Sequence, residues 1–185
     1  MTSQCRDSVD RLLSEWRRER PDLDPSPVGI QGRIMLLSAH LMRQSEDWLA
    51  PLGLGWEAFS LIVTLRRSGE PYELRPTDLL RESLLTSGAI TNRIDRVEQM
   101  GLVERRSDPN DRRSSVVRLT PSGLKMADEV IGRHFAGVDG RLAALTATER
   151  RQLAGLLSKL LGSAEEAAGR NTVRGRKREA RASTM

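Results

Sequence analysis

The sequence predicts a mainly α-helical fold that carries one small β-hairpin. Apolar residues recur at helical spacing through most of the 185-residue chain. Proline or glycine stands near the ends of the predicted helices, and the period changes to that of short strands only after Gly101. Helices with wide apolar stripes lie towards both ends of the chain, and such stripes need a partner surface.

The overall charge is compatible with several kinds of partner. Lys and Arg number 30 against 25 Asp and Glu, which gives a net charge of +5. This balance suits DNA, RNA or a membrane surface, although a solvated basic face has the same composition. Aromatic residues make up only 3% of the chain, which argues against stacking of single-stranded bases. We find no apolar run of about 18 residues and no signal-peptide pattern, and therefore expect a cytoplasmic protein without a membrane partner.

Two helices are predicted before the central part of the chain. The first covers residues 7–20, where Val9, Leu13 and Trp16 share one stripe, and Pro21 ends it. The second follows the turn at residues 24–27 and continues to about Leu49, before Pro51 and Gly53. Residues 1–53 are therefore expected to form an N-terminal helical region.

The next segment has the order helix, short helix, turn, helix. A helix is predicted over residues 56–67, a loop runs through residues 71–74, and Pro76 opens a short helix. After the turn at 84–88, Thr86 or Ser87 can cap a helix that runs to Met100, and Gly101 suits its left-handed stop. This is the order that a helix-turn-helix requires.

A hairpin follows this helix-turn-helix. Residues 102–106 and 115–119 read as short strands around a charged tip at 108–111. Arg112 and Arg113 lie beside the tip, where they could reach a minor groove or flanking phosphates. We assign Asp111 a bracing role through a neighbouring arginine. Residues 54–120 are therefore predicted to be a winged helix-turn-helix, with the hairpin as its wing.

Two further helices and a basic tail complete the chain. Thr120 and Pro121 start a long helix, and Thr146 with Glu149 forms a capping-box pattern before the leucine stripe of residues 153–161. We expect residues 121–168 to be C-terminal dimerisation helices. Residues 169–185 are arginine-rich with almost nothing apolar, which predicts a disordered tail. The tail either adds phosphate attraction or is a dispensable, solvated end.

The predicted last helix of the helix-turn-helix has two faces. Ile90, Ile94 and Val97 fall on one side, and polar side chains gather on another. Arg can donate two hydrogen bonds to guanine, and Asn can bond adenine in the same way. The alternative is a surface helix with solvated arginines. The candidate DNA-binding residues are Ser87, Ala89, Thr91, Asn92, Arg93, Arg96, Arg112 and Arg113.

Two segments resemble the MarR family of transcriptional regulators. One is residues 85–98 with their exit at 101–106, which look like that family's recognition helix. The other is residues 108–113 with 117–123, which look like its wing and the start of its long dimer helix. The resemblance implies a homodimer interlocked by N- and C-terminal helices, with two winged domains on a pseudo-palindromic duplex operator. It also implies regulation of transcription, most simply as a repressor.

The additional first helix resembles the PecS-like branch of the family, which includes urate-responsive regulators. The resemblance implies a ligand site formed by Trp16, Arg93 and Arg105, with Ser60 at the position of that branch's aspartate. Because serine lacks a fixed negative charge, a small anionic ligand such as a carboxylate or phosphate fits better than urate. The alternative is that Trp16 only packs the first helix and that Arg105 pairs with a nearby acid.

No pattern in the sequence supports catalysis, a cofactor or a bound metal. His40 and His134 are far apart and lack neighbouring ligands, and Cys5 has no second thiol. Phosphate-binding glycine loops and nucleophile motifs are absent. The prediction is thus a ligand-responsive DNA-binding regulator and not an enzyme. The rival is an architectural DNA-binding protein without an effector, which would show little sequence preference and no ligand response.

Overall fold

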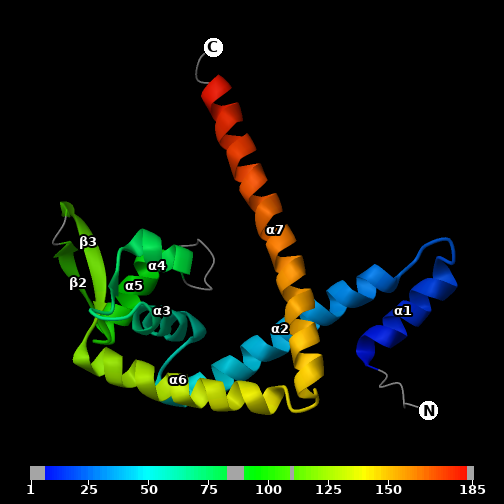
Figure 1. The fold of residues 1–185 in the computed structure, drawn as a ribbon, viewed down its shortest axis with the longest axis horizontal. Coiled ribbons are helices and arrows are strands. Elements are labelled where there is room, and N and C mark those ends of the chain that lie inside the picture. Colours follow the sequence, from blue (N-terminus) through cyan, green and yellow to red (C-terminus); the bar gives the residue numbers. More distant parts are fainter. Residues whose placement is uncertain (1–6, 83–89, 109–110, 183–185) are drawn as a thin grey trace. The chain divides into compact units, whose positions relative to one another are not determined.

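The structure is a computed structural model that describes residues 7–82, 90–108 and 111–182, excluding the side chains of 111–113 and 168–182. It confirms the mainly α-helical fold with a small sheet (Figure 1). The chain forms two compact units, residues 1–131 and 132–185. In order, the elements are α1 (Ser8–Glu19), α2 (Ser26–Leu49), the short helix η1 (Ala50–Leu52), α3 (Trp56–Arg67), β1 (Glu73–Leu74), α4 (Pro76–Glu82), α5 (Ile90–Gln99), β2 (Val103–Asp108), β3 (Asp111–Leu119), α6 (Pro121–Arg141) and α7 (Ala147–Ala182).

Helix α1 docks on α2 as a separate helical layer. Asp7 caps α1 by accepting from the backbone N–H groups of Val9 and Asp10. Val9 and Leu13 are buried, and they lie against glycines of α2; a Cβ at Gly29 would come within 2.8 Å of Leu13. The guanidinium of Arg33 in α2 donates to the carboxylates at the start of α1. This packing leaves Trp16 about half exposed.

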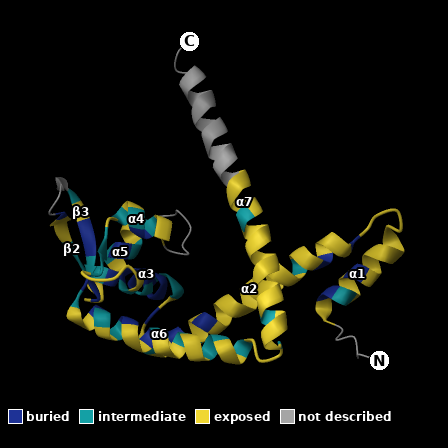
Figure 2. Cartoon of the chain, viewed as in Figure 1, coloured by how far each residue is buried: buried dark blue, intermediate teal, exposed yellow. Residues whose placement is uncertain are grey.

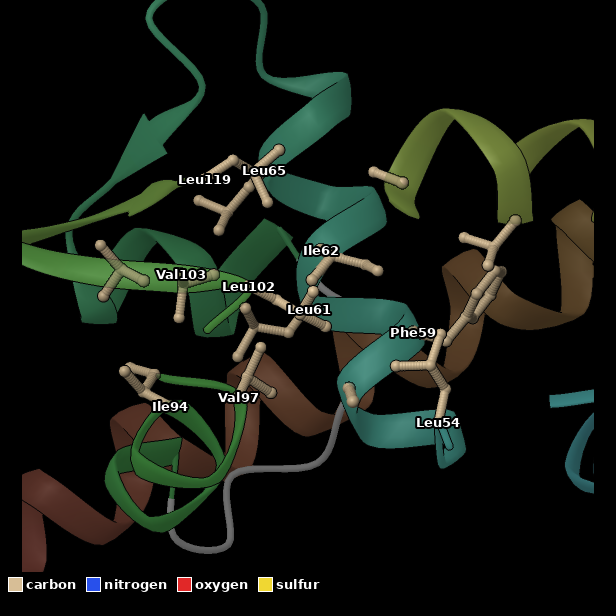
Figure 3. Packing of buried hydrophobic residues seen from close by; sticks show 14 of the residues in the cluster. Leu54, Phe59, Leu61, Ile62, Leu65, Ile94, Val97, Leu102, Val103 and Leu119 are labelled. Carbon is tan, nitrogen blue, oxygen red and sulfur yellow. The ribbon is translucent and has the colours of Figure 1, made fainter. Parts of the chain in front are cut away.

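Helix α3 lies at the centre of the hydrophobic core. Leu61, Ile62 and Leu65 are fully buried, and Figure 3 shows Leu61 directed towards Val97 and Leu102. The same core includes Leu49 of α2 and Ala127 and Val130 of α6. The predicted regions 1–53, 54–120 and 121–168 therefore share one core at their junctions. The structure divides the chain only between residues 131 and 132.

The sheet has three antiparallel strands in the order β1, β3, β2. The two predicted strands are confirmed, and the β2–β3 ladder runs further than expected, from the Val103–Leu119 pair to the Asp108–Asp111 pair. An irregularity in register lies between Ser107 and Asp108. The prediction of a plain loop at residues 71–74 was wrong, because Glu73 and Leu74 pair with β3 as strand β1. A strand of two residues is too short for an alternating pattern to reveal it.

A tight junction joins the end of α5, the start of β2 and the start of α6. Gly101 has a φ of 72°, which confirms the predicted left-handed stop. Its carbonyl accepts from the hydroxyls of Thr120 and Ser122 at 2.7 and 2.9 Å. The predicted cap is also confirmed, because Thr120 Oγ1 accepts from Gly123 N–H at 3.0 Å. The start of α6 is thereby fixed to the exit of α5.

In the second unit, the predicted capping box at the start of α7 is present. Thr146 N–H donates to the carboxylate of Glu149 at 2.8 Å, and Glu149 N–H donates to Thr146 Oγ1 at 3.3 Å. Helix α7 continues to Ala182, whereas the sequence predicts disorder from residue 169 onward; residues 183–185 of that predicted tail lie outside the described residues. Arg, Lys, Glu and Ala are good helix formers, so a low apolar content does not prevent this segment from being helical.

Much of α2 and of the described part of α7 is exposed (Figure 2), and the exposed residues include many apolar side chains. On α2 they include Ile34, Leu37 and Leu41, and on α7 Leu157 and Leu160. Among the described residues, no single helix is long and apolar enough to cross a membrane; the bent pair formed by Ser26–Leu52 and Trp56–Arg67 passes that test on length and composition alone.

Candidate DNA-binding surface and ligand groove

Helix α5 presents a polar face opposite its buried face. Ile94 and Val97 are almost completely buried against the core. Thr91, Asn92 and Arg96 are exposed, as the sequence predicts for residues that contact DNA bases. The other two predicted residues of this surface, Ser87 and Ala89, and the predicted cap at Thr86 or Ser87 lie outside the described residues.

Arg93 differs from its neighbours because it is directed towards α3. Its side chain is only 14% exposed, and Nη2 lies 3.0 Å from Oε1 of Glu57 in the first turn of α3. The sequence placed Arg93 both on the reading face and in the ligand site; the ion pair turns its side chain towards Glu57, and both roles stay predictions. Glu57 was missed because no spacing rule connects residues 36 positions apart on different helices.

A groove of about 530 Å³ lies between α5 and the region where α2 ends and α3 begins. We call it the α3–α5 groove. Its walls combine the Arg93–Glu57 pair with Arg96 and with apolar side chains. Its lining residues are Met42, Glu46, Gly53, Gly55, Trp56, Glu57, Ala58, Arg93, Arg96, Val97 and Met100. The groove thus borders both the inward-facing and the exposed arginine of α5.

The other predicted ligand residues do not line this groove. Ser60 is buried within α3, and Trp16 lies 49% exposed on α1. Arg105 pairs with both Asp95 and Glu98, and its backbone N–H donates to Glu98 at 2.9 Å. Partial burial opposes the charge of Arg105, but these two carboxylates raise its pKa above the ordinary value. The structure therefore places Arg105 in ion pairs with nearby acids, as the alternative given for this residue in the sequence analysis expects.

The wing carries an ion pair between a buried carboxylate and a half-exposed arginine that the sequence did not reveal. Asp108 at the end of β2 is 4% exposed and accepts from Arg75, which lies between β1 and α4. No pattern in the sequence connects these two positions. Arg112 and Arg113 belong to β3, but their side chains, and that of Asp111 with its predicted bracing role, lie outside the description.

Across the described residues, no group of three or more His, Cys, Asp or Glu side chains could hold a metal ion. The arrangement that the structure does contain is a short helix α4, a helix α5 with an exposed polar face, and a β2–β3 hairpin beside them. These parts define a winged helix-turn-helix DNA-binding protein.

Comparison with known proteins identifies the family. Residues 54–115 match the MarR family. The chain is 30% identical over 152 residues to the HTH-type transcriptional regulator PecS of Dickeya dadantii, across 82% of this chain and 92% of PecS. It is 27% identical over 158 residues to the transcriptional repressor MprA of Escherichia coli K12, across 85% of this chain and 89% of MprA. This chain belongs to the MarR family of transcriptional regulators and is not an enzyme.

A solved structure supports the same assignment. A point mutant of MarR from E. coli, crystallised with operator DNA, superimposes with a TM-score of 0.64 at 27% identity. The superposition covers 75% of this chain and 98% of that protein. The predicted winged helix-turn-helix fold is therefore confirmed.

Proposed function

We propose that this regulator is a homodimeric, cytoplasmic repressor that binds a pseudo-palindromic operator and leaves it when a small anionic metabolite binds. The observation that carries operator binding is the exposed face of α5, with Thr91, Asn92 and Arg96 opposite the buried Ile94 and Val97. The DNA-bound MarR structure and the repressor name of MprA support the proposal.

Dimerisation follows from the exposed apolar faces of α2 and α7. Side chains such as Leu37 and Leu157 are about half exposed in the single chain. Exposed apolar side chains in such number on each helix of a free monomer would favour aggregation. A second copy of the chain would cover these faces and would give the two-fold symmetry that a pseudo-palindrome requires.

The proposed effector response centres on Arg93. Because Arg93 is mostly buried and held by Glu57 at 3.0 Å, an incoming anion has to compete with an internal carboxylate for the same guanidinium. A carboxylate or phosphate ligand matches the geometry of that group. Movement of Arg93 would shift α5, and a small shift is enough to spoil bidentate contacts with bases. Trp16, Ser60 and Arg105, which do not line the α3–α5 groove, belong to the effector set only through the resemblance to the PecS-like branch.

Operator recognition is tested with the Arg96→Ala variant. We expect it to lose about 1–3 kcal/mol of operator binding and to relax selectivity at one base position. The probe is a duplex selected from random DNA with the unaltered protein, measured against unselected duplex. Arg151→Ala on α7 is the matched control, because it removes the same charge from an exposed position outside α5. An unchanged ratio of selected to unselected binding for Arg96→Ala would reject the assignment.

The effector response is tested by titrating citrate and urate into the protein–operator complex. Citrate is expected to release the operator at a lower concentration than urate. Glu57→Gln, which removes the competing carboxylate, should lower the citrate concentration needed, and Arg105→Ala should abolish release while leaving operator binding intact. Trp16 fluorescence reports binding, with Trp16→Phe as the control. Release of Arg105→Ala at the unaltered concentration would place the site elsewhere, and the absence of any release would favour a DNA-binding protein without an effector.

A further inference from the structure

The outer part of the wing is held by a buried carboxylate. Oδ2 of Asp108 accepts from Nε of Arg75 at 2.7 Å, and Nη2 of Arg75 lies 2.7 Å from the same oxygen. Ser114 Oγ of the opposite strand donates to it at 3.2 Å. Two nitrogen atoms of Arg75 and the hydroxyl of Ser114 on β3 therefore meet on one carboxylate oxygen of β2.

The position of Arg75 makes this interaction a link between two DNA-binding elements. Arg75 directly precedes Pro76, and its carbonyl accepts from Leu79 N–H at 2.8 Å as α4 begins. Asp108 is the last residue of β2, next to the register irregularity. Arg112 and Arg113 follow within five residues. The ion pair thus joins the start of the helix-turn-helix to the end of the wing that bears the two arginines.

The burial of Asp108 distinguishes the Arg75–Asp108 pair from an ordinary surface ion pair. In the same hairpin, Arg106 pairs with Glu104 at 2.7 Å, but both side chains are substantially exposed, and such pairs contribute little. A carboxylate as buried as Asp108 must be paired to be tolerated, so loss of its partner destabilises the local structure. Nearby Ser107 and Ser115 are exposed and add no apolar packing. Asp108 is therefore the buried side chain that holds this end of the hairpin, in addition to the backbone pairing of β2 with β3.

We propose that Arg75 and Asp108 are positioning residues that fix the outer wing against the start of α4, so that Arg112 and Arg113 reach the DNA beside α5. This inference rests on the proposed contact between the wing and the operator. Neither residue of the pair has to touch DNA for the effect. If this is so, breaking the pair weakens operator binding only because Arg112 and Arg113 lose their contacts with DNA.

The test is a double-mutant cycle between the pair and the wing tip. The pair is removed with Arg75→Met plus Asp108→Asn, which removes both of its charges together and so leaves neither of these two side chains charged without the other. The tip variant replaces the two wing arginines, with Arg112→Ala plus Arg113→Ala. Glu104→Gln, which breaks the exposed pair in the same hairpin, is the matched control. Operator affinity is measured for each protein and for the combined variant across a series of salt concentrations, and thermal unfolding confirms that each is folded.

Removal of the pair is expected to weaken operator binding about tenfold, the cost of one charge-assisted hydrogen bond. The dependence of log affinity on log salt should flatten by about one unit for each phosphate that the wing no longer neutralises. In the background that lacks the tip arginines, removing the pair should have no further effect, and Glu104→Gln should behave as the unaltered protein.

Two results would overturn the inference, and they have different consequences for the proposed function. In the first, the tip variant weakens operator binding, but removal of the pair either has no effect or weakens binding equally with and without the tip arginines. The pair then does not position the wing, and the proposed function is unaffected. If the tip variant itself binds the operator normally, the wing contact in the proposed function fails and the inference fails with it.

Discussion

Replacing Gly123 by alanine should destabilise the junction between the recognition helix and α6. A Cβ at this position would lie 1.8 Å from the carbonyl oxygen of Leu102, 2.8 Å from its carbonyl carbon and 3.2 Å from its Cα. All three atoms belong to the backbone, so no side-chain rotation relieves the clash. Helix α6 must therefore move away from the segment that leaves α5.

The cost has two parts. Overpacking at a well-packed site costs about 1–3 kcal/mol. Movement of α6 also strains the hydrogen bonds from Thr120 and Ser122 to the Gly101 carbonyl, and each bond contributes about 1 kcal/mol. We therefore expect Gly123→Ala to lower the free energy of unfolding by about 2–5 kcal/mol.

Urea unfolding followed by far-UV circular dichroism measures this effect, at one fixed protomer concentration because a dimer's stability depends on it. Gly132→Ala in the same helix is the control. A Cβ at Gly132 meets nothing within 4 Å, so alanine should stabilise by about 0.5–1 kcal/mol through its higher helix propensity. If Gly123→Ala unfolds at the same urea concentration as the unaltered protein, the close approach at Leu102 has no energetic significance.

Three further changes probe other parts of the chain. Leu157→Glu places a charge in the exposed apolar face of α7, and it should abolish dimers in sedimentation experiments together with operator binding; a folded monomer as the main form of the unaltered protein at micromolar concentration would contradict this. Thr146→Ala removes the cap of α7 and should cost about 1 kcal/mol in thermal unfolding. Hydrogen bonding from Arg33 lowers the pKa of Asp7 below its ordinary value of 3.8, so the stability it provides is present at neutral pH and is lost as the pH falls from that ordinary value through the lowered pKa. Asp7→Asn should therefore reduce the acid sensitivity of α1 docking, and an unchanged pH profile would reject this role.

The local signals in the sequence were sufficient for the main helices and the wing. Apolar spacing and the breaks at Pro21 and Gly53 predicted α1, α2 and α3 to within one or two residues at most ends. Gly101, Thr120 and Thr146 marked helix ends correctly because their roles depend only on nearby backbone groups. The missed strand has a physical reason, because β1 exists only through pairing with β3. The helix that continues through the basic end of α7 agrees with helix propensity, whereas the prediction of disorder weighed apolar content.

The candidate site was less predictable, because its important contacts join distant parts of the chain. The exposed face of α5 follows from helical periodicity alone. The partner of Arg93, by contrast, is Glu57 on another helix, and the partner of Arg75 is Asp108 on a strand 33 residues away. Arg105 has two acids within reach, Asp95 and Glu98, and their spacing on α5 gave no indication of which basic residue they would bind.

The position of Arg93 explains how one groove could couple a ligand to DNA. Arg93 and Arg96 are three residues apart on α5 and both line the α3–α5 groove, and Arg93 is the one held by Glu57. An anion that takes Arg93 from Glu57 acts on the same helix that presents Arg96 to the operator. Because coupling between two binding sites is reciprocal, operator binding must weaken ligand binding by the same factor by which the ligand weakens operator binding. If the proposed function holds, the strength of the Arg93–Glu57 pair sets both the ligand concentration needed for release and the resistance of the operator complex to competing anions.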